Sequence, residues 1–180
     1  MPQTALILLA DGFEEIEAVV PIDILRRAGI RVTTAALGAG PHVTGKNGLI
    51  LHADSTVAAV AGGVFTCIIV PGGPAVPLLR ADSRVRELVA RHAAAGSWVA
   101  AICAGPTVLK DAGVLEGRRH TAHFSVHGEL PAAELGERTV VDGRVITSRG
   151  AGTALDFALV VVEKLVSAES SREIARAIAA

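Results

Sequence analysis

Cys103 is the residue whose neighbours in the sequence best suit covalent chemistry. It ends the apolar run Trp98–Ile102, and Ala104, Gly105 and Pro106 follow it directly. A strand that turns sharply into a helix exposes the side chain at the turn, as in the nucleophile elbow of hydrolases. The N-terminus of the following helix favours the thiolate over the thiol. The sequence therefore predicts that Cys103 is a nucleophile rather than a small packed hydrophobe.

The chain has one other cysteine, Cys67, which we expect to be structural. It opens the apolar run Cys67–Val70, which is predicted to be a buried strand. Two cysteines cannot form a disulfide framework, and neither belongs to a C-x-x-C pair. Reduced thiols in a chain of this kind are typical of the cytoplasm, which is the predicted location.

A thiol nucleophile needs a group that accepts its proton, and the loops after the predicted strands offer carboxylates and imidazoles. Glu14 and Glu15 begin a predicted helix, where acidic side chains compensate the helix dipole. Glu17 lies one position deeper, where its carboxylate could point into a crevice. His123 follows a predicted short strand, Arg119–Ala122, and could reach the same edge of the sheet.

Two further patterns allow alternative interpretations. His120, His123 and His127 have a spacing that metal sites use, but no second cysteine or acidic cluster completes a site, so no metal is expected. The segment Pro71–Pro74 contains two glycines after a predicted strand. Their backbone N–H groups could form an oxyanion hole, although a glycine pair is also typical of a plain tight turn.

The elements that must position these residues follow from short apolar runs bounded by turn residues. Five continuous runs predict strands buried on both faces, as in a parallel sheet: Ala5–Ala10, Arg31–Leu37, Cys67–Val70, Trp98–Ile102 and Val145–Ser148. Four amphipathic stretches predict helices: Glu14–Ala28, Asp82–Ala95, Thr153–Leu165 and Glu169–Ala179. Pro21 is expected to kink or interrupt the first of them. Asn-Gly and Asp-Gly pairs predict hairpins at Val43–Leu51 and Val140–Val145.

Strands that alternate with helices predict an α/β sandwich with a mostly parallel sheet. Ligands bind such sheets at the carboxyl ends of the strands, which is where the candidate residues lie. A length of 180 residues favours one domain, residues 1–180. No linker or repeat divides the chain.

Composition excludes several function classes. With 51% hydrophobic and 19% charged residues, the chain is not intrinsically disordered. A net charge of −1 and only 3% aromatic residues indicate neither the basic surface nor the aromatic stacking residues that nucleic-acid binding needs. No apolar run approaches the roughly 20 residues that a membrane-spanning helix needs.

Taken together, the motifs resemble the ThiJ/PfpI superfamily, and within it the DJ-one-like branch that contains a parkinsonism-associated protein. The similarity runs in order along the chain from about Ala5 to Leu165. Four segments carry it: Ala10–Glu17, Pro71–Gly73, Ala100–Pro106 and Thr147–Thr153.

This resemblance implies a flavodoxin-like three-layer α/β sandwich and a homodimer. It implies that Cys103 is the nucleophile, that the Glu17 carboxyl hydrogen-bonds the sulfur and that His123 acts in acid–base steps. The backbone N–H groups of Gly73 and Ala104 would form the oxyanion hole. Four more residues would line the substrate pocket or approach it across the dimer: Glu14, Gly72, Asp23 and Arg27.

The activity that the resemblance implies is a cysteine-dependent, cofactor-free reaction on 2-oxoaldehydes such as methylglyoxal. Members of the branch are glyoxalases that need no glutathione, or deglycases of glyoxal adducts. The alternative is a redox-sensing or chaperone-type stress protein that works through oxidation of Cys103. Both functions use the same thiol, so the sequence leaves both open.

At three positions this sequence differs from other members of the superfamily, and the differences limit which activities are expected. Peptidases of the superfamily carry a histidine directly after the cysteine, where this chain has Ala104, which argues against a peptidase or amidase. Glutamine amidotransferases use a His-x-Glu pair, whereas Phe124 and Ser125 follow His123 here. The eukaryotic branch member has an arginine in its first hairpin where this chain has Asn47, so anion binding there is expected to be weaker.

Overall fold

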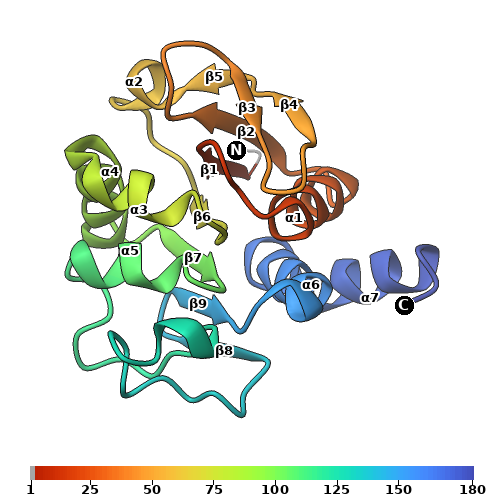
Figure 1. Cartoon of the computed structure of the whole chain (residues 1–180). Helices are drawn as coiled ribbons and strands as arrows, with labels where there is room; N and C mark the ends of the chain where they lie inside the picture. The colour runs from red at the N-terminus through yellow and green to blue at the C-terminus, as the bar shows by residue number, and fades with distance from the viewer. Residues whose placement is uncertain (1–2) are drawn as a thin grey trace.

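The computed structural model describes residues 3–180, and a seven-stranded sheet forms its centre (Figure 1). In spatial order the strands are β5 (Ser55–Thr56), β2 (Arg31–Ala36), β1 (Thr4–Leu9), β6 (Cys67–Val70), β7 (Trp98–Ile102), β9 (Val145–Ser148) and β8 (Thr139–Asp142). All neighbouring strands are parallel except β8, which pairs antiparallel with β9. The predicted mostly parallel sheet is therefore confirmed.

Helices cover both faces of this sheet, which makes the three-layer α/β sandwich that was predicted (Figure 1). One face carries α1 (Glu15–Arg27) and α6 (Ala154–Leu165), with α7 (Ala168–Ala177) packed against α6. The other face carries α2 (Val57–Val60), α3 (Val76–Ala81), α4 (Ser83–Ala94) and α5 (Pro106–Asp111). The central strands β1, β6 and β7 are almost fully buried, because helices pack on both sides of them.

A small hairpin of β3 (His42–Thr44) and β4 (Ile50–His52) closes over the loop that follows β1, and it confirms the predicted Val43–Leu51 hairpin. The N–H of Gly12 donates to the Thr44 carbonyl at 2.7 Å, and the N–H of Lys46 donates to the Phe13 carbonyl at 3.0 Å. These bonds hold the hairpin beside the carboxyl ends of the central strands.

Of the two predicted effects of Pro21, a kink or an interruption of the first helix, the interruption is wrong, because α1 runs continuously from Glu15 to Arg27. Proline has no N–H to donate to the carbonyl of Glu17, so one helical hydrogen bond is lost. The buried Pro21 ring packs inside the protein, and contacts of α1 with β2 and α6 hold the helix together. Packing on the protein interior outweighs the local penalty here.

The predicted short strand Arg119–Ala122 is also wrong, because this segment makes no ladder with a neighbouring strand. Its backbone N–H groups bond to side chains instead. Arg119 donates to Asp142 Oδ2 at 2.9 Å, and Thr121 donates to Thr147 Oγ1 at 2.9 Å. The segment is still held against the β8–β9 edge, so it delivers His123 to the predicted end of the sheet.

Within residues 3–180, the structure contains no helix with the length and apolar character needed to cross a membrane.

Candidate active site

Cys103 occupies a sharp turn between β7 and α5, with a φ angle of 65°. Among residues 3–180, only Ala179 is another non-glycine residue with positive φ. Hydrogen bonds on both sides hold this strained backbone: the Cys103 N–H donates to the Ser148 carbonyl at 2.9 Å, and the Cys103 carbonyl accepts from the His123 N–H at 2.9 Å. Strain of this kind persists only where its surroundings enforce it, and it is common at reactive residues. The turn has the geometry of a nucleophile elbow.

Gly72 fills the narrow space between Cys103 and Glu17. A Cβ atom at Gly72 would lie 2.7 Å from Cys103 Cβ and 2.7 Å from Glu17 Oε2. No side chain fits there, so the loop after β6 can pass directly beside the sulfur and the carboxyl. The N–H of Gly72 donates to Glu17 Oε2 at 2.8 Å.

Glu17 lies in the first turn of α1 and is only 1% exposed. Burial raises the pKa of its carboxyl to about 7, and this outweighs the hydrogen bonds from the Cys103 thiol and the Gly72 N–H that favour the carboxylate. Glu14 caps the same helix, because its Oε2 accepts from the Glu17 N–H at 2.9 Å. A carboxyl with a pKa near neutrality is suited to both accepting and returning a proton.

The thiol of Cys103 is half-buried, and burial raises its pKa to about 12. The charge of Glu17 and the hydrogen bond to it raise this pKa as well, whereas the N–H groups of Ala104 and Gly73 lower it by donating to the sulfur. The expectation of a thiolate favoured by the helix N-terminus is therefore wrong for the resting site. The N-terminus of the six-residue α5 is outweighed by burial and by a carboxylate in direct contact with the sulfur.

The Cys103 thiol and the Glu17 carboxyl are thus joined by a hydrogen bond, and their protonation states are linked. Below pH of about 7 the carboxyl carries a proton that can be donated to the sulfur, and above that pH the thiol donates to the carboxylate. Deprotonation of the sulfur then occurs by transfer to Glu17 as it attacks a substrate.

His123 comes from the segment after Thr121 and lies beside Cys103 and Glu17 at the wall of one cavity, which has a volume of about 310 Å³. Its ring is held by Ser125, whose hydroxyl oxygen lies 2.8 Å from Nδ1. Gly73, whose φ is +92°, and Ala104 line the same cavity. The structure therefore brings together all five residues that the sequence placed at the reaction centre.

Four residues of the cavity wall were not among the predicted site residues: Lys46, Pro74, Ser125 and Ala151. The ammonium group of Lys46 lies 3.7 Å from Glu14 Oε1, so the hairpin brings a positive charge to the site. The position of Lys46 next to Asn47 in the hairpin was the available signal. Asn47 itself binds Glu15, with its Nδ2 donating to Oε2 at 3.0 Å, rather than facing the cavity.

Asp23 and Arg27 do not join the cavity within this chain. They lie on the exposed face of α1, and Arg27 Nε donates to Asp23 Oδ2 at 2.7 Å. Their approach to a partner's site stays a prediction. Among residues 3–180, no group of three His, Cys, Asp or Glu side chains is placed to hold a metal ion.

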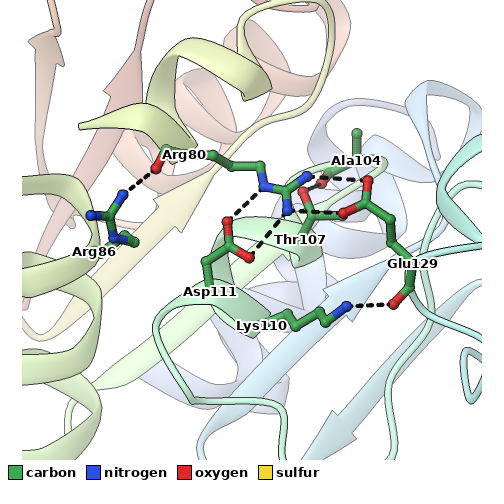
Figure 2. Close-up of polar contacts among 7 residues, drawn as sticks. All are labelled: Arg80, Arg86, Ala104, Thr107, Lys110, Asp111 and Glu129. Atoms are coloured by element: carbon green, nitrogen blue, oxygen red, sulfur yellow. Dashed lines mark hydrogen bonds and ion pairs between the residues drawn. The ribbon is translucent and has the colours of Figure 1, made fainter. Parts of the chain in front are cut away.

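Ion pairs of Arg80 join three of the segments that lead to or from the site (Figure 2). Arg80 of α3 donates to both carboxylate oxygens of Asp111, at 2.7 and 3.1 Å, and also to the Glu129 carboxylate, at 3.1 Å. Helix α3 follows the Gly72–Gly73 loop, α5 follows Cys103, and Glu129 follows the turn that carries His123. The charge-assisted bonds of Arg80 therefore fix the relative positions of these segments.

The whole chain is similar to known proteins in sequence and in fold. A sequence model of the DJ-1/PfpI family matches residues 3–164. Protein dj-1beta of Drosophila melanogaster is 39% identical over 180 residues, which cover 98% of this chain and 96% of that protein. A Caenorhabditis elegans protein named glutathione-independent glyoxalase DJR-1.2 is 36% identical over 176 residues, with 96% and 94% covered. The crystal structure of Drosophila melanogaster DJ-1beta matches with a TM-score of 0.95 at 37% identity, covering 99% of this chain and 98% of that one.

Proposed function

This chain belongs to the DJ-1/PfpI family, and from that premise we propose that it is a cofactor-free enzyme that converts 2-oxoaldehydes such as methylglyoxal to 2-hydroxy acids without glutathione. The observation that carries the proposal is the contact of the Cys103 thiol with the buried Glu17 carboxyl, beside two N–H donors. The name of the Caenorhabditis elegans relative supports the same reaction class. The cavity of about 310 Å³ has room for a three-carbon aldehyde.

In the first step the sulfur of Cys103 bonds to the aldehyde carbon, and the carbonyl electron pair moves to its oxygen. The thiol proton passes to the Glu17 carboxylate as the bond forms, and it then protonates that oxygen to give a hemithioacetal. The N–H groups of Gly73 and Ala104, which surround the sulfur, stabilise the oxygen while it is negative.

In the second step the hemithioacetal becomes a thioester of the 2-hydroxy acid. A base, Glu17 or His123, removes the hydrogen from the sulfur-bearing carbon, and the electron pair forms an enediol with the neighbouring carbon. The proton returns to that neighbouring carbon, while the hydroxyl proton of the first carbon moves to the second oxygen. No oxidant or metal is needed, because one carbon is oxidised as the other is reduced.

In the third step water attacks the thioester, the carbon–sulfur bond breaks and the thiol recovers its proton. The sum is methylglyoxal plus water giving lactate. Glyoxal adducts of amines would follow the same path, with the amine as an additional leaving group, so deglycase activity is part of this proposal.

The test is methylglyoxal consumption and lactate formation by the purified protein and by Cys103→Ser. We expect the variant to lose at least about 10³-fold in kcat, because a serine hydroxyl beside a carboxylate is a far weaker nucleophile. Cys67→Ala is the matched control, since Cys67 is fully buried in β6 and should leave turnover unchanged. Full activity of Cys103→Ser would overturn the mechanism.

A redox-sensing role is the second candidate, and the partial exposure of the Cys103 thiol favours it over any such role for the buried Cys67. The Gly73 and Ala104 N–H groups and a protonated Glu17 could hydrogen-bond the oxygens of a sulfinate at Cys103. Mass spectrometry after graded peroxide tests it. Selective oxidation of Cys103 without aldehyde turnover would favour the sensor, and equal oxidation of both cysteines would exclude it.

We also propose that the chain forms a homodimer through the exposed face of α1 and the neighbouring hairpin. Ile16 and Val19 on α1 are 50% and 39% exposed, and Leu49 and Ile50 on the hairpin are 47% and 68% exposed. The bond between Glu15 and Asn47 joins these two elements, so the four apolar side chains belong to one region. Sedimentation of the wild type and of Val19→Glu tests it, with a monomeric wild type as the contrary result.

A further inference from the structure

Ser125 determines which nitrogen of His123 carries the proton. The Ser125 N–H donates to His123 Nδ1 at 3.3 Å, and the Ser125 hydroxyl oxygen lies 2.8 Å from the same atom. A backbone N–H can only donate, so Nδ1 must offer a lone pair and cannot carry a proton in the neutral ring. The hydroxyl then donates to Nδ1 as well, and the proton of the neutral imidazole lies on Nε2.

Other contacts hold the ring in this orientation. The ring of Phe124 packs against it, with centroids 4.1 Å apart and planes inclined by 36°. The Cδ2 edge faces Gly150 so closely that a Cβ atom there would lie 3.3 Å away. Turning the ring over would place a carbon opposite the Ser125 N–H donor and lose both hydrogen bonds at Nδ1.

The Nε2–H group of the ring is available to donate a hydrogen bond to a substrate. Across residues 3–180, Nε2 has no hydrogen-bond partner, and the ring lines the cavity together with Cys103 and Glu17. We infer that Ser125 is a positioning residue that presents His123 as an Nε2–H donor to the substrate, which leaves Glu17 as the base that carries the carbon-bound proton. This inference rests on the proposed function. It assigns the removal of the carbon-bound hydrogen to Glu17, a choice between Glu17 and His123 that the proposed function left open.

The chemistry of the second step fits this division of roles. When Glu17 takes the proton from the sulfur-bearing carbon, the electron pair forms the carbon–carbon double bond and the second carbonyl oxygen becomes negative. The Nε2–H of His123 then stabilises that oxygen by a hydrogen bond, as neutral imidazoles do for enediolates in isomerases. Glu17 returns its proton to the second carbon, so no proton is lost from the site.

The first test measures the tautomer directly, by nitrogen-15 NMR of the protein labelled at histidine. The wild type should show a protonated Nε2 and an unprotonated Nδ1 in the neutral ring of His123. Ser125→Ala removes the hydroxyl donor and leaves only the longer bond of 3.3 Å from the backbone N–H, so Nδ1–H should become a minor, measurable form rather than the main one. Ser125→Thr, which keeps the hydroxyl, should restore the wild-type spectrum. A wild-type spectrum with Nδ1 protonated would overturn the inference.

The second test separates donor from base by turnover of methylglyoxal. We expect Ser125→Ala to lower kcat about three- to tenfold with little change in KM, which corresponds to one lost hydrogen bond, and Ser125→Thr to recover most of it. His123→Gln keeps an N–H donor but cannot act as a base, so it should retain clearly more activity than His123→Ala. Equal loss in the two His123 variants would refute the donor role.

The tests distinguish this inference from the proposed function. If the wild type does not turn over methylglyoxal, the proposed function fails, whereas the NMR spectrum still decides the tautomer. Alkylation of Cys103 by iodoacetamide and thermal unfolding of each variant check that the site remains folded.

Discussion

Glu17 and Cys103 share a hydrogen bond, and burial raises the pKa of the carboxyl to about 7 and that of the thiol to about 12. The carboxyl therefore loses its proton first, and the thiol keeps its proton at neutral pH. In such a site the Cys103 sulfur becomes nucleophilic during the attack, when its proton passes to Glu17. The resting enzyme holds a thiol and not a thiolate. The pH dependence of the reaction follows from this order.

We predict that kcat/KM for methylglyoxal rises as the pH increases through about 7 and then levels off. Above this pH Glu17 is the carboxylate that can accept the thiol proton, and below it the carboxyl is already protonated. Glu17→Gln should lose about 10²- to 10⁴-fold, the usual contribution of a general base, and should not show this rise. An unchanged pH profile in Glu17→Gln would contradict the assignment.

The raised pKa of Glu17 also predicts that its ionisation destabilises the folded protein at high pH. The pKa of its carboxyl is about 7 in the folded state, against an ordinary value of 4.5, so the folded protein holds this proton more tightly than the unfolded chain. Below pH of about 4.5 both states are protonated and there is no cost. Between pH 4.5 and 7 the cost grows to about 2–3 kcal/mol.

Glu17→Gln should therefore raise the free energy of unfolding by about 2 kcal/mol at pH of about 8 and change it little at pH of about 4.5. The oxygen of the substituted amide side chain can still accept from the Gly72 N–H. Urea unfolding at the two pH values measures the difference. A gain of the same size at both pH values would show that ionisation is not its cause.

We predict that Gly72→Ala abolishes most of the activity, because its methyl group would lie 2.7 Å from both Cys103 Cβ and Glu17 Oε2. Separating these two groups by even a fraction of an ångström weakens the proton transfer between them. Gly136→Ala is the matched control, since a Cβ atom there meets nothing within 4 Å. Wild-type turnover in Gly72→Ala would mean that the contact between Cys103 and Glu17 is not required.

We predict that Arg80→Met lowers the free energy of unfolding by about 1–2 kcal/mol and also lowers kcat, because Asp111 and Glu129 lose the guanidinium that joins them (Figure 2). Arg119→Met is the control. It removes a similar two-bond contact with Glu134, but at a more exposed site away from the reaction centre. If both variants change stability and turnover equally, Arg80 has no special positioning role.

The parts of the fold that depend on local pattern could be predicted from the sequence. Continuous apolar runs predicted β6 and β7 to the residue, and α4 with its cap residue Asp82 falls within the predicted helix Asp82–Ala95. The elbow at Cys103 could be recognised because a strand, a reactive residue and small neighbours adjoin one another in the sequence.

What could not be predicted depends on contacts between distant segments. The continuity of α1 through Pro21 comes from tertiary packing, and the raised pKa of Cys103 comes from burial and from a carboxylate 86 positions earlier in the chain. The short helix α3 was also missed, because six residues with a proline carry no helical periodicity. Lys46 enters the cavity only because the hairpin closes over the loop after β1.

Next to the sulfur, Gly73 and Ala104 line the cavity without large side chains, so substitutions there would crowd the thiol itself. Variation that reshapes specificity can therefore act at Lys46 and Ala151, which line the same cavity and make none of the contacts that hold the thiol, its proton acceptor or the His123 ring. Diversification of these two positions is the direct route to accept larger or charged aldehydes while the thiol, its proton acceptor and His123 stay unchanged. A library confined to them would explore new substrates without passing through inactive scaffolds.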